Sequence, residues 1–287
     1  MLCLLEWFLF PPTRLPLASL HQKIAHKTIL ITGASYGIGA QTAHLLAAPS
    51  VHLILVARTQ TRLQTLQKEL ESKGATVDFY TVDLTVPTQV NHLLHHLQQQ
   101  PQPLDIIINN AGHSILRSIH QAKDRYHDFE RTMAINYLGP VRLLLPLLQD
   151  LETQAGHLIN VSALNVLLLP APYWSAYQAS KTAFDQWFRS VAPELRAKGV
   201  QCSSIYFPLV RTRMIAPTKA YQNTPALLPQ QAAAILGKVI LTQKTQYKPW
   251  WAVFAQLGSA FFRQPWEWGC TWWIKRRASK SSSKESP

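Results

Sequence analysis

Short apolar segments alternate with longer helical segments along most of this chain. The expected strands are residues 28–32, 51–57, 76–82, 104–109, 157–161 and 200–207. The expected helices are residues 59–73, 87–98, 126–150, 174–198 and 229–243. Segment 51–57 is almost continuously apolar, which is typical of a strand buried on both faces. This alternation favours right-handed crossovers and predicts an α/β fold with a doubly wound parallel sheet.

A glycine-rich turn lies directly between the first expected strand and the helix that follows it. Gly33 permits a tight turn, Gly37 lets the backbone approach a pyrophosphate, and Gly39 lets helix and strand pack closely. The phosphates would lie at a helix N-terminus, where free N–H groups and the helix dipole favour anions. The turn therefore predicts a Rossmann-type nucleotide site. The expected contacts in it are Gly33, Ser35, Gly37, Ile38 and Gly39.

The end of the second expected strand indicates which nucleotide binds. A site for NAD usually has a carboxylate there, which holds the ribose hydroxyls. This chain has Ala57 and Arg58 instead, and the guanidinium group of an arginine can bind the 2′-phosphate of NADP. An ordinary surface arginine is the alternative, but the pattern favours NADP and thus NADPH as the cofactor. After the third strand, Asp83 could accept a hydrogen bond from the adenine amino group, with Leu84 against the ring.

A tyrosine and a lysine lie one helical turn apart in the expected helix 174–198. Tyr177 and Lys181 would share one face, and the ammonium group would lower the pKa of the phenol toward the working pH. Such a tyrosine can donate a proton to a carbonyl oxygen as hydride reaches the carbon. This spacing alone also occurs by chance on protein surfaces. Ser162, however, ends a strand at its carboxyl end, where ligands bind in such sheets.

Together these motifs resemble the short-chain dehydrogenase/reductase family from about residue 28 to residue 243. The resemblance implies a catalytic tetrad in which Tyr177 is the acid/base and Ser162 steadies the substrate oxygen. Lys181 would tune Tyr177 and bind the nicotinamide ribose, and Asn136 would hold a water of a proton relay. The further cofactor contacts that it implies are Asn110, Ala111, Gly112, Tyr177, Lys181, Val210 and Thr212.

Pro140 lies four residues after Asn136 and has no N–H to return to the carbonyl of residue 136. That carbonyl could therefore be released from the helix ladder and hold a water. A simple kink at Pro140 is an equally good interpretation.

A narrower resemblance concerns segments 127–133 and 208–219, which are similar to bacterial fatty acyl-CoA reductases of the short-chain type. It implies reduction of a long-chain acyl-CoA to a fatty aldehyde with NADPH. A reductase of a lipid ketone, sterol-like or keto-sphingoid, and a nucleotide-bound scaffold remain alternatives. Pro208-Leu209 replaces the family's usual Pro-Gly turn, and a Val-Asp-Gly-Gly ending is absent. A seventh strand and its dimer contacts therefore stay open.

The two ends of the chain differ from its middle. Residues 1–10 are apolar apart from Glu6, but they are too few to span a bilayer and lack the features of a signal peptide. Six of the nine tryptophans lie between residues 250 and 273, and three basic residues follow at 275–277. Such a segment favours an interfacial position on anionic lipid, and packing onto the protein or a dimer partner is the alternative. The expected division is an N-terminal segment 1–25, a Rossmann-type domain 26–246 and a tail 247–287.

The net charge is +13, with 28 Lys and Arg residues against 15 Asp and Glu residues. Nucleic acid is not an expected partner, because we find no basic stripe and no reader module. Three widely spaced cysteines indicate neither a disulfide framework nor a metal site. We expect a cytoplasmic enzyme, peripheral on an anionic membrane, that acts on a hydrophobic small molecule. A homo-oligomer also remains open.

Overall fold

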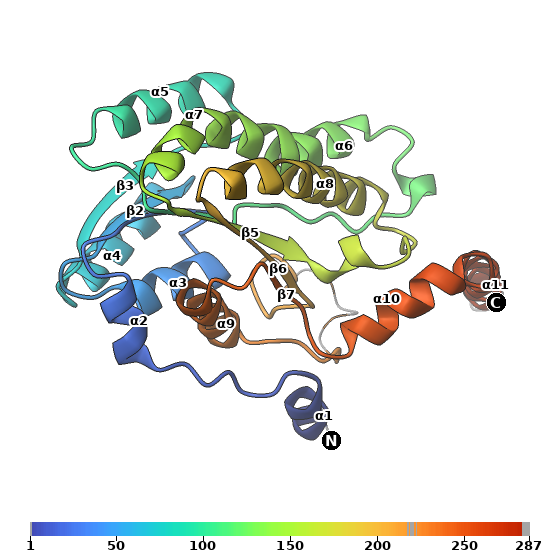
Figure 1. Ribbon diagram of the computed structural model, residues 1–287. Coiled ribbons are helices and arrows are strands. Elements are labelled where there is room, and N and C mark those ends of the chain that lie inside the picture. Colours follow the sequence, from blue (N-terminus) through green and yellow to red (C-terminus); the bar gives the residue numbers. More distant parts are fainter. Residues whose placement is uncertain (1, 217, 219–220, 222, 283–287) are drawn as a thin grey trace.

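The protein is built around a single parallel sheet. The computed structural model describes residues 2–216, 218, 221 and 223–282. Seven strands form the sheet in the order β3-β2-β1-β4-β5-β6-β7, and neighbouring strands run parallel (Figure 1). The strands are β1 Thr28–Thr32, β2 His52–Ala57, β3 Thr76–Thr81, β4 Ile106–Asn109, β5 His157–Ala163, β6 Gln201–Phe207 and β7 Gln246–Tyr247. The predicted doubly wound α/β fold is confirmed, and the open question of a seventh strand is answered by a two-residue strand.

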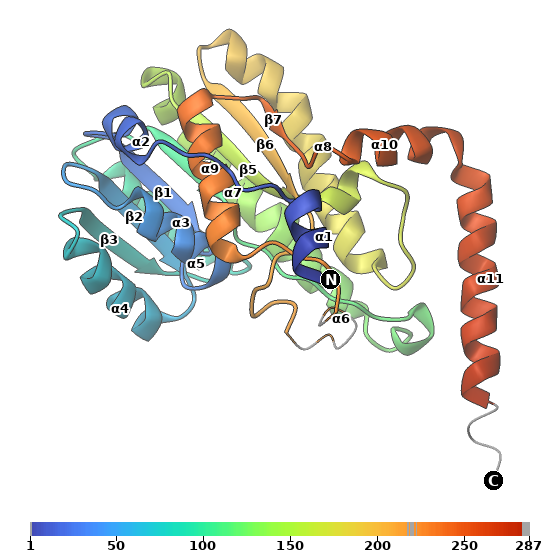
Figure 2. The same cartoon turned by 90° about the horizontal axis from the view of Figure 1, so that it is seen from below.

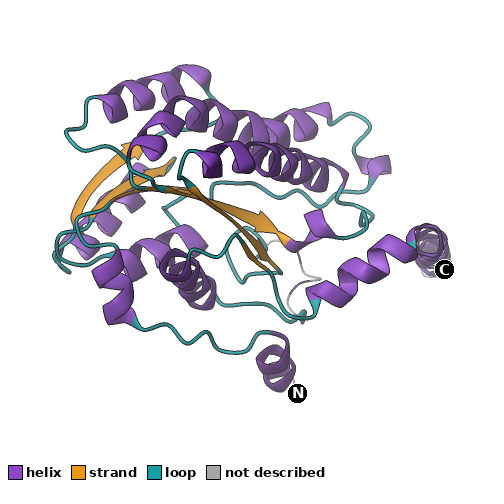
Figure 3. Cartoon of the chain, in the orientation of Figure 1, coloured by secondary structure: helices purple, strands orange, loops and turns teal. Residues whose placement is uncertain are grey.

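Two layers of helices cover the sheet (Figure 3). One face carries α2 (Leu17–Lys23), α3 (Gly37–Leu46), α4 (Gln60–Glu71) and α9 (Pro229–Thr242). The other face carries α5 (Pro87–Gln98), α7 (Gly139–Thr153) and α8 (Ser175–Ala197), with α6 (Tyr126–Met133) beside α8. The strand interiors are buried on both sides, which explains their nearly continuous apolar sequences. The order of strands reverses between β1 and β4, so the carboxyl ends there offer a ligand site.

The long helix expected over residues 126–150 forms, but it is not regular throughout. The chain is helical without a break from Tyr126 to Thr153, and a π-helical turn over Ala134–Leu138 separates α6 from α7. In that turn the N–H of Gly139 bonds to the carbonyl of Ala134, five residues back. The physical reason is that Pro140 has no N–H for the carbonyl of Asn136, so the regular ladder cannot continue through this point.

The N-terminal segment is partly built into the core. Leu20 and Ile24 are fully buried, and the ideal Cβ position of Gly237 in α9 lies 3.1 Å from Leu20. Residues 17–24 therefore pack with the sheet domain, although the expected boundary was placed at residue 26. Before them, α1 (Leu2–Leu9) lies at the edge of the molecule (Figure 1).

The tail forms two further helices, α10 (Ala252–Phe261) and α11 (Arg263–Ser282). Both lie outside the two helical layers, and α11 extends away from the sheet (Figure 2). Within the described part of the chain, none of the helices combines the length and the apolarity needed to cross a membrane.

Candidate active site

The glycine turn has the geometry that a phosphate site requires. Gly33 and Gly37 have φ values of +66° and +58°, which favour glycine. A Cβ on Gly39 would collide with the carbonyl oxygen of Gly33, so the helix can approach the strand only because that side chain is absent. Helix α3 begins at Gly37, and Tyr36 before it offers no side-chain cap. The first N–H groups of α3 are therefore available to an anion.

The turn is held in place by the segment that follows β4. The Asn110 amide donates to the carbonyls of Thr32 (2.9 Å) and Gly33 (3.2 Å). The hydroxyl of Thr32 in turn accepts from the backbone N–H groups of Asn110 and Ala111, both at 3.0 Å. Asn110 and Ala111 thus brace the turn, whereas the sequence had predicted them only as cofactor contacts. Thr32 was not singled out as a site residue, although it is the first residue of the motif.

The residues predicted to recognise the adenosine end lie at the carboxyl ends of β2 and β3. Arg58 is largely exposed, with its Nη1 atom 3.8 Å from an oxygen of Asp83. The other oxygen of Asp83 accepts from the N–H and the hydroxyl of Thr85. One oxygen of Asp83 thus serves the local turn and the other faces Arg58. Leu84 is buried in the core, so little of its side chain remains for an adenine ring.

The segment after β6 closes over the glycine turn. Val210 is buried, and the ideal Cβ position of Gly37 lies 2.9 Å from the methyl carbon of Thr212. The guanidinium of Arg213 lies 4.1 Å from the centre of the Tyr36 ring. Val210 and Thr212 therefore lie close enough to the glycine turn to contact a nucleotide bound there. Residues 217 and 219 of the segment that resembles acyl-CoA reductases lie outside the described residues.

Asn136 holds two neighbouring elements together from the π turn. Its side-chain oxygen accepts from the N–H of His113, and its amide donates to the His113 carbonyl, both at 2.9 Å. The amide also donates to the Ser180 hydroxyl at 2.9 Å, and that hydroxyl donates to the carbonyl of Tyr177. The sequence predicted Asn136 but neither His113 nor Ser180. Only the packing of the π turn against α8 reveals those two partners.

Lys181 is buried where three elements meet. Its Nζ atom donates to the carbonyl of Val161 in β5 at 3.3 Å. The ideal Cβ position of Gly112 lies 3.2 Å from this Nζ atom and 3.0 Å from the side-chain oxygen of Asn136. A side chain at residue 112 would therefore displace both groups. Burial lowers the pKa of Lys181 to about 8, against a raising effect of Asp185.

Ser162 and Tyr177 complete the predicted tetrad. The Ser162 hydroxyl is buried next to Val161 and has no hydrogen-bond partner among the described residues. The Trp174 ring lies 5.4 Å from the Tyr177 ring and 6.0 Å from the Tyr221 ring, so the surroundings of Tyr177 are aromatic. Neither Trp174 nor Tyr221 was predicted, because a single aromatic residue in a loop carries no sequence signal.

One expectation about Tyr177 is wrong. The sequence predicted that Lys181 lowers the pKa of the phenol, but burial raises that pKa, and Tyr221 adds to the effect. The reason is that the phenol loses contact with water, while the Lys181 ammonium group donates to the Val161 carbonyl. The phenol is therefore held in its protonated form, which is the form needed to donate a proton.

These features fit a dinucleotide with a nicotinamide ring. The turn leaves free N–H groups at α3, and Arg58 stands at the end of β2 with most of its surface exposed. Lys181 and the unpartnered Ser162 hydroxyl lie at the carboxyl ends of the central strands. In the described part of the chain, His, Cys, Asp and Glu side chains form no group of three that could hold a metal.

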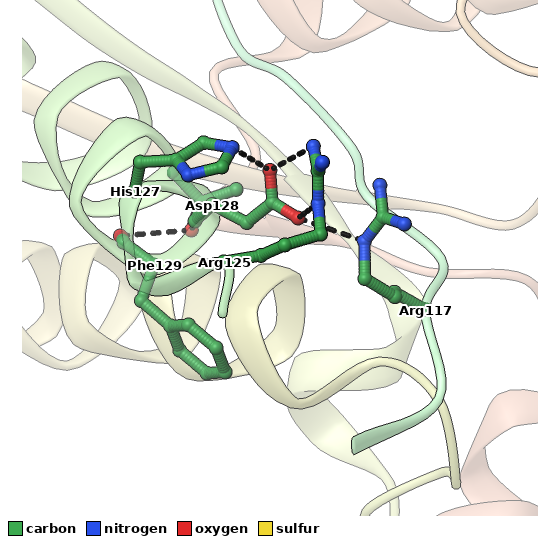
Figure 4. Close-up of polar contacts among 6 residues, drawn as sticks. Arg117, Arg125, His127, Asp128 and Phe129 are labelled. Carbon is green, nitrogen blue, oxygen red and sulfur yellow. Dashed lines mark hydrogen bonds and ion pairs between the residues drawn. The ribbon is translucent and has the colours of Figure 1, made fainter. Parts of the chain in front are cut away.

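The segment between β4 and α6 is anchored by a buried carboxylate. Asp128 accepts from Arg117 at 2.8 Å and from Arg125 at 3.0 Å, with His127 at 3.3 Å (Figure 4). The hydrogen bond from Arg125 lowers the pKa of Asp128 against the effect of burial, and Arg117 adds to it. Asp128 and His127 belong to segment 127–133 of the narrower resemblance, so part of that pattern serves to fix this loop.

An apolar groove of about 960 Å³ lies beside α8 and beneath α11. Ala179 and Thr182 of α8 line it, together with Val166 and Leu168 of the preceding loop and Ile274 of α11. Ala179 is about 200° around the helix from Tyr177, because successive residues are about 100° apart. The groove therefore lies on the side of α8 away from the tetrad.

Known proteins resemble this chain in sequence. The model of a family described as short chain dehydrogenase matches residues 27–223. A fatty acyl-CoA reductase of Acinetobacter baylyi is 42% identical over 225 residues, which cover 78% of this chain and 76% of the relative. A fatty acyl-CoA reductase of Mycobacterium tuberculosis is 37% identical over 78% of this chain and 76% of its own. A very-long-chain 3-oxoacyl-CoA reductase of Neurospora crassa is 29% identical over 78% of this chain and 69% of its own.

Solved structures share the fold. A short-chain dehydrogenase from Sphingobium yanoikuyae in complex with NADPH has a TM-score of 0.71 and 22% identity, covering 91% of this chain and 96% of its own. A metagenomic short-chain oxidoreductase in complex with NADP has a TM-score of 0.67 and 24% identity, covering 78% of this chain and 97% of its own. At these identities the likeness concerns the fold alone.

Proposed function

This chain belongs to the short-chain dehydrogenase/reductase family and is an oxidoreductase, and on that premise we propose that it reduces long-chain fatty acyl-CoA to fatty aldehyde with NADPH. The observation that carries the chemistry is the Ser162 hydroxyl, buried without a partner beside the carbonyl that holds Lys181. A buried hydroxyl without a partner is costly, and a substrate oxygen would satisfy it. Tyr177, one turn before Lys181, is protonated and can supply the proton.

The acyl-CoA assignment is supported by sequence similarity and by the surroundings of Tyr177. Two relatives at 42% and 37% identity are fatty acyl-CoA reductases, and the similarity covers most of this chain. The ring of Trp174 lies beside that of Tyr177 and is stacked with that of Tyr221, and such an aromatic surface suits an apolar acyl chain.

NADPH is the proposed cofactor because Ala57 and Arg58 stand at the end of β2, where NAD sites usually have a carboxylate. When bound, NADPH supplies a hydride from C4 of its nicotinamide. The N–H groups at the start of α3 would hold its pyrophosphate, and Arg58 its 2′-phosphate. Lys181 would donate to the nicotinamide ribose with N–H groups that the Val161 carbonyl does not use.

The tetrad would act on the thioester carbonyl as follows. The hydroxyls of Ser162 and Tyr177 donate to the carbonyl oxygen and stabilise the charge that develops on it as the carbon receives hydride. Tyr177 then gives its proton to this oxygen, which yields a hemithioacetal, and Lys181 stabilises the phenolate that remains. The C–S bond of the hemithioacetal then breaks, and the proton of its hydroxyl group passes to the departing sulfur, so that the products are the aldehyde and the CoA thiol.

The second candidate is reduction of a lipid ketone. The similarity to very-long-chain 3-oxoacyl-CoA reductases supports it, and the same tetrad would serve. An assay with palmitoyl-CoA and NADPH decides between them. The first function predicts release of free thiol and of an aldehyde that a hydrazine reagent traps. A 3-oxoacyl-CoA reduced to the hydroxy product without release of thiol, with palmitoyl-CoA inert, would replace the first proposal with the second.

We further propose that the enzyme is peripheral on the cytoplasmic leaflet through its tail. Trp266 donates to the carbonyl of Pro170 at 2.9 Å, and the Trp273 ring lies 6.0 Å from that of Tyr173. The tail is thus attached to the loop between Ser162 and Tyr177, so a membrane on the tail would lie near the site. Flotation of the full chain with anionic liposomes, compared with a chain ending at Lys248, tests this role. Equal flotation of both chains would show that the tail does not bind the membrane and instead packs on the protein or forms a homo-oligomer.

A further inference from the structure

The two ends of the chain meet in space. The indole N–H of Trp250, just before α10, donates to the carbonyl of Phe8 in α1 at 3.2 Å. The Phe8 and Trp250 rings make an edge contact at 5.2 Å, and Phe254 continues the row with its ring 6.3 Å from that of Trp250. In Figures 1 and 2 α1 lies on the side of the molecule from which the tail departs. Segments about 240 residues apart therefore share one surface.

Helix α10 turns its apolar face outward. The exposed large residues Trp250, Val253, Phe254, Leu257 and Phe261 follow the spacing of a single helical face. The opposite face meets the protein, since Ala252 is fully buried and the Ser259 hydroxyl accepts from the N–H of Leu169. A helix of a water-soluble surface has the reverse arrangement. In α11, by contrast, the tryptophans lie on several sides of the helix.

Helix α1 has the same orientation. Leu4, Leu5, Trp7 and Phe8 are exposed, and Trp7 has 63% of its surface accessible. Glu6 lies on the opposite side, because residues four and eight are one turn apart and residue six is about 200° from residue four. The charged residue that interrupts this apolar sequence therefore points toward the protein, and the apolar side chains point away from it.

Charge around the surface indicates what covers it. The described side chains of segments 4–16 and 248–276 include the basic residues Arg14, Lys248, Arg263, Lys275 and Arg276. The acidic residues there are Glu6 and Glu267, and both are in ion pairs, with Arg211 and Arg263. Exposed aromatic residues on one helical face with a basic surround match the boundary of an anionic bilayer. A second copy of the same chain would bring like charges together.

The inner side of α1 contacts the segment that closes over the glycine turn. The Glu6 carboxylate accepts from Arg211 at 2.6 Å and from the N–H of Ala226 at 3.1 Å. The hydrogen bond from Arg211 lowers the pKa of Glu6, so the carboxylate is ionised at neutral pH. Arg211 lies between Val210 and Thr212, and Thr212 packs against Gly37. A continuous set of contacts thus leads from α1 to the phosphate turn.

We propose that α1 and α10 form one surface that docks on an anionic bilayer, and that Glu6 couples docking to the segment over the glycine turn, so that the bilayer tightens NADPH binding. Eight residues are too few for a stable helix in water, so a bilayer that orders α1 also fixes Glu6 against Arg211. Coupling of this kind is typically about 5- to 150-fold in affinity. The proposal rests on the proposed function in taking NADPH as the ligand of the turn and in placing the tail on an anionic bilayer.

The docking surface is tested by flotation with vesicles of phosphatidylcholine and phosphatidylglycerol. Trp7→Ser and Phe254→Ser should each lower the bound fraction, and together they should lower it further. Leu145→Ser is the matched control, because Leu145 is also exposed but lies on α7 across the sheet, and it should float as the wild type does. Wild-type flotation of Trp7→Ser would overturn the role of α1. Equal flotation on pure phosphatidylcholine would overturn the anionic assignment.

The coupling is tested by calorimetric titration with NADPH, with and without the same vesicles. The wild-type dissociation constant should fall about 5-fold or more when vesicles are present. Glu6→Gln should float normally yet show no such fall, while Glu194→Gln on the exposed side of α8 should behave as the wild type. A vesicle effect that is absent in the wild type, or retained in Glu6→Gln, would overturn the coupling. Neither assay contains acyl-CoA, so both outcomes are independent of the proposed substrate.

Discussion

Replacing the buried Lys181 should stabilise the protein while it abolishes the proposed reduction. Burial lowers the pKa of Lys181 to about 8 from its ordinary value of 10.5. That difference corresponds to about 3 kcal/mol by which the folded state disfavours the ammonium form at pH 7. Lys181→Met keeps the length of the side chain without the charge. It loses the 3.3 Å hydrogen bond to Val161, which reduces the gain by about 1 kcal/mol. We therefore expect a net gain of about 2 kcal/mol at pH 7.

The effect should depend on pH with a definite sign. Between pH 8 and 10.5 the unfolded chain keeps the proton that folded Lys181 has released, so wild-type stability rises with pH in this range. By pH 9.5 the cost of the buried charge falls to about 1 kcal/mol, and the advantage of Lys181→Met should nearly vanish.

Urea unfolding of the protein without cofactor, at pH 7 and at pH 9.5, measures both quantities. Lys198→Met is the control, because Lys198 is exposed at the end of the same helix, and its unfolding free energy should stay within about 0.5 kcal/mol of wild type. A Lys181→Met variant that is less stable than wild type at pH 7, or whose advantage grows at pH 9.5, would refute the assignment of a costly buried ammonium group.

Three further outcomes are expected. Tyr177→Phe should lower the reduction rate about 10²- to 10⁴-fold with NADPH affinity nearly unchanged, and a variant that keeps more than about a tenth of the rate would exclude the phenol as the acid. Arg58→Ala should weaken NADPH binding by about 1.5–3 kcal/mol and NADH binding much less, as measured by titration, and equal losses would show that Arg58 does not read the 2′-phosphate. The reduction rate should fall as pH rises above 8, because Lys181 then loses its charge, and a rate profile that stays flat to pH 10 would contradict this role.

Most of the sheet could be predicted because its signals are local. The strands are short apolar segments, and the expected limits of β1 and α5 agree with the structure at both ends. The helix expected over residues 126–150 forms, but its π turn at residues 134–138 was not predicted, because amphipathic spacing continues through these residues. That turn depends on the N–H that Pro140 lacks.

The residues of the candidate site stay a prediction, and the structure corrects one expectation about their energetics. Ser162, Tyr177, Lys181 and Asn136 were assigned through the resemblance to the family, whose motifs consist of residue types at fixed spacing in the sequence. The direction in which the pKa of Tyr177 shifts could not be predicted, because it depends on how much water the folded protein excludes. Partners such as Ser180 likewise follow from packing between distant segments.

The sequence by itself determined the alternation of strands and helices, the glycine turn and the order of the side chains proposed for catalysis. These depend on neighbours within one helical turn or one strand, where spacing fixes geometry. Only the tertiary structure decided that Gly112, Asn136 and Lys181 converge, that Glu6 reaches Arg211, and that α10 turns its apolar face outward. Such contacts join residues that are up to about 200 positions apart. Their formation depends on the burial and close packing of the whole chain, which no local pattern encodes.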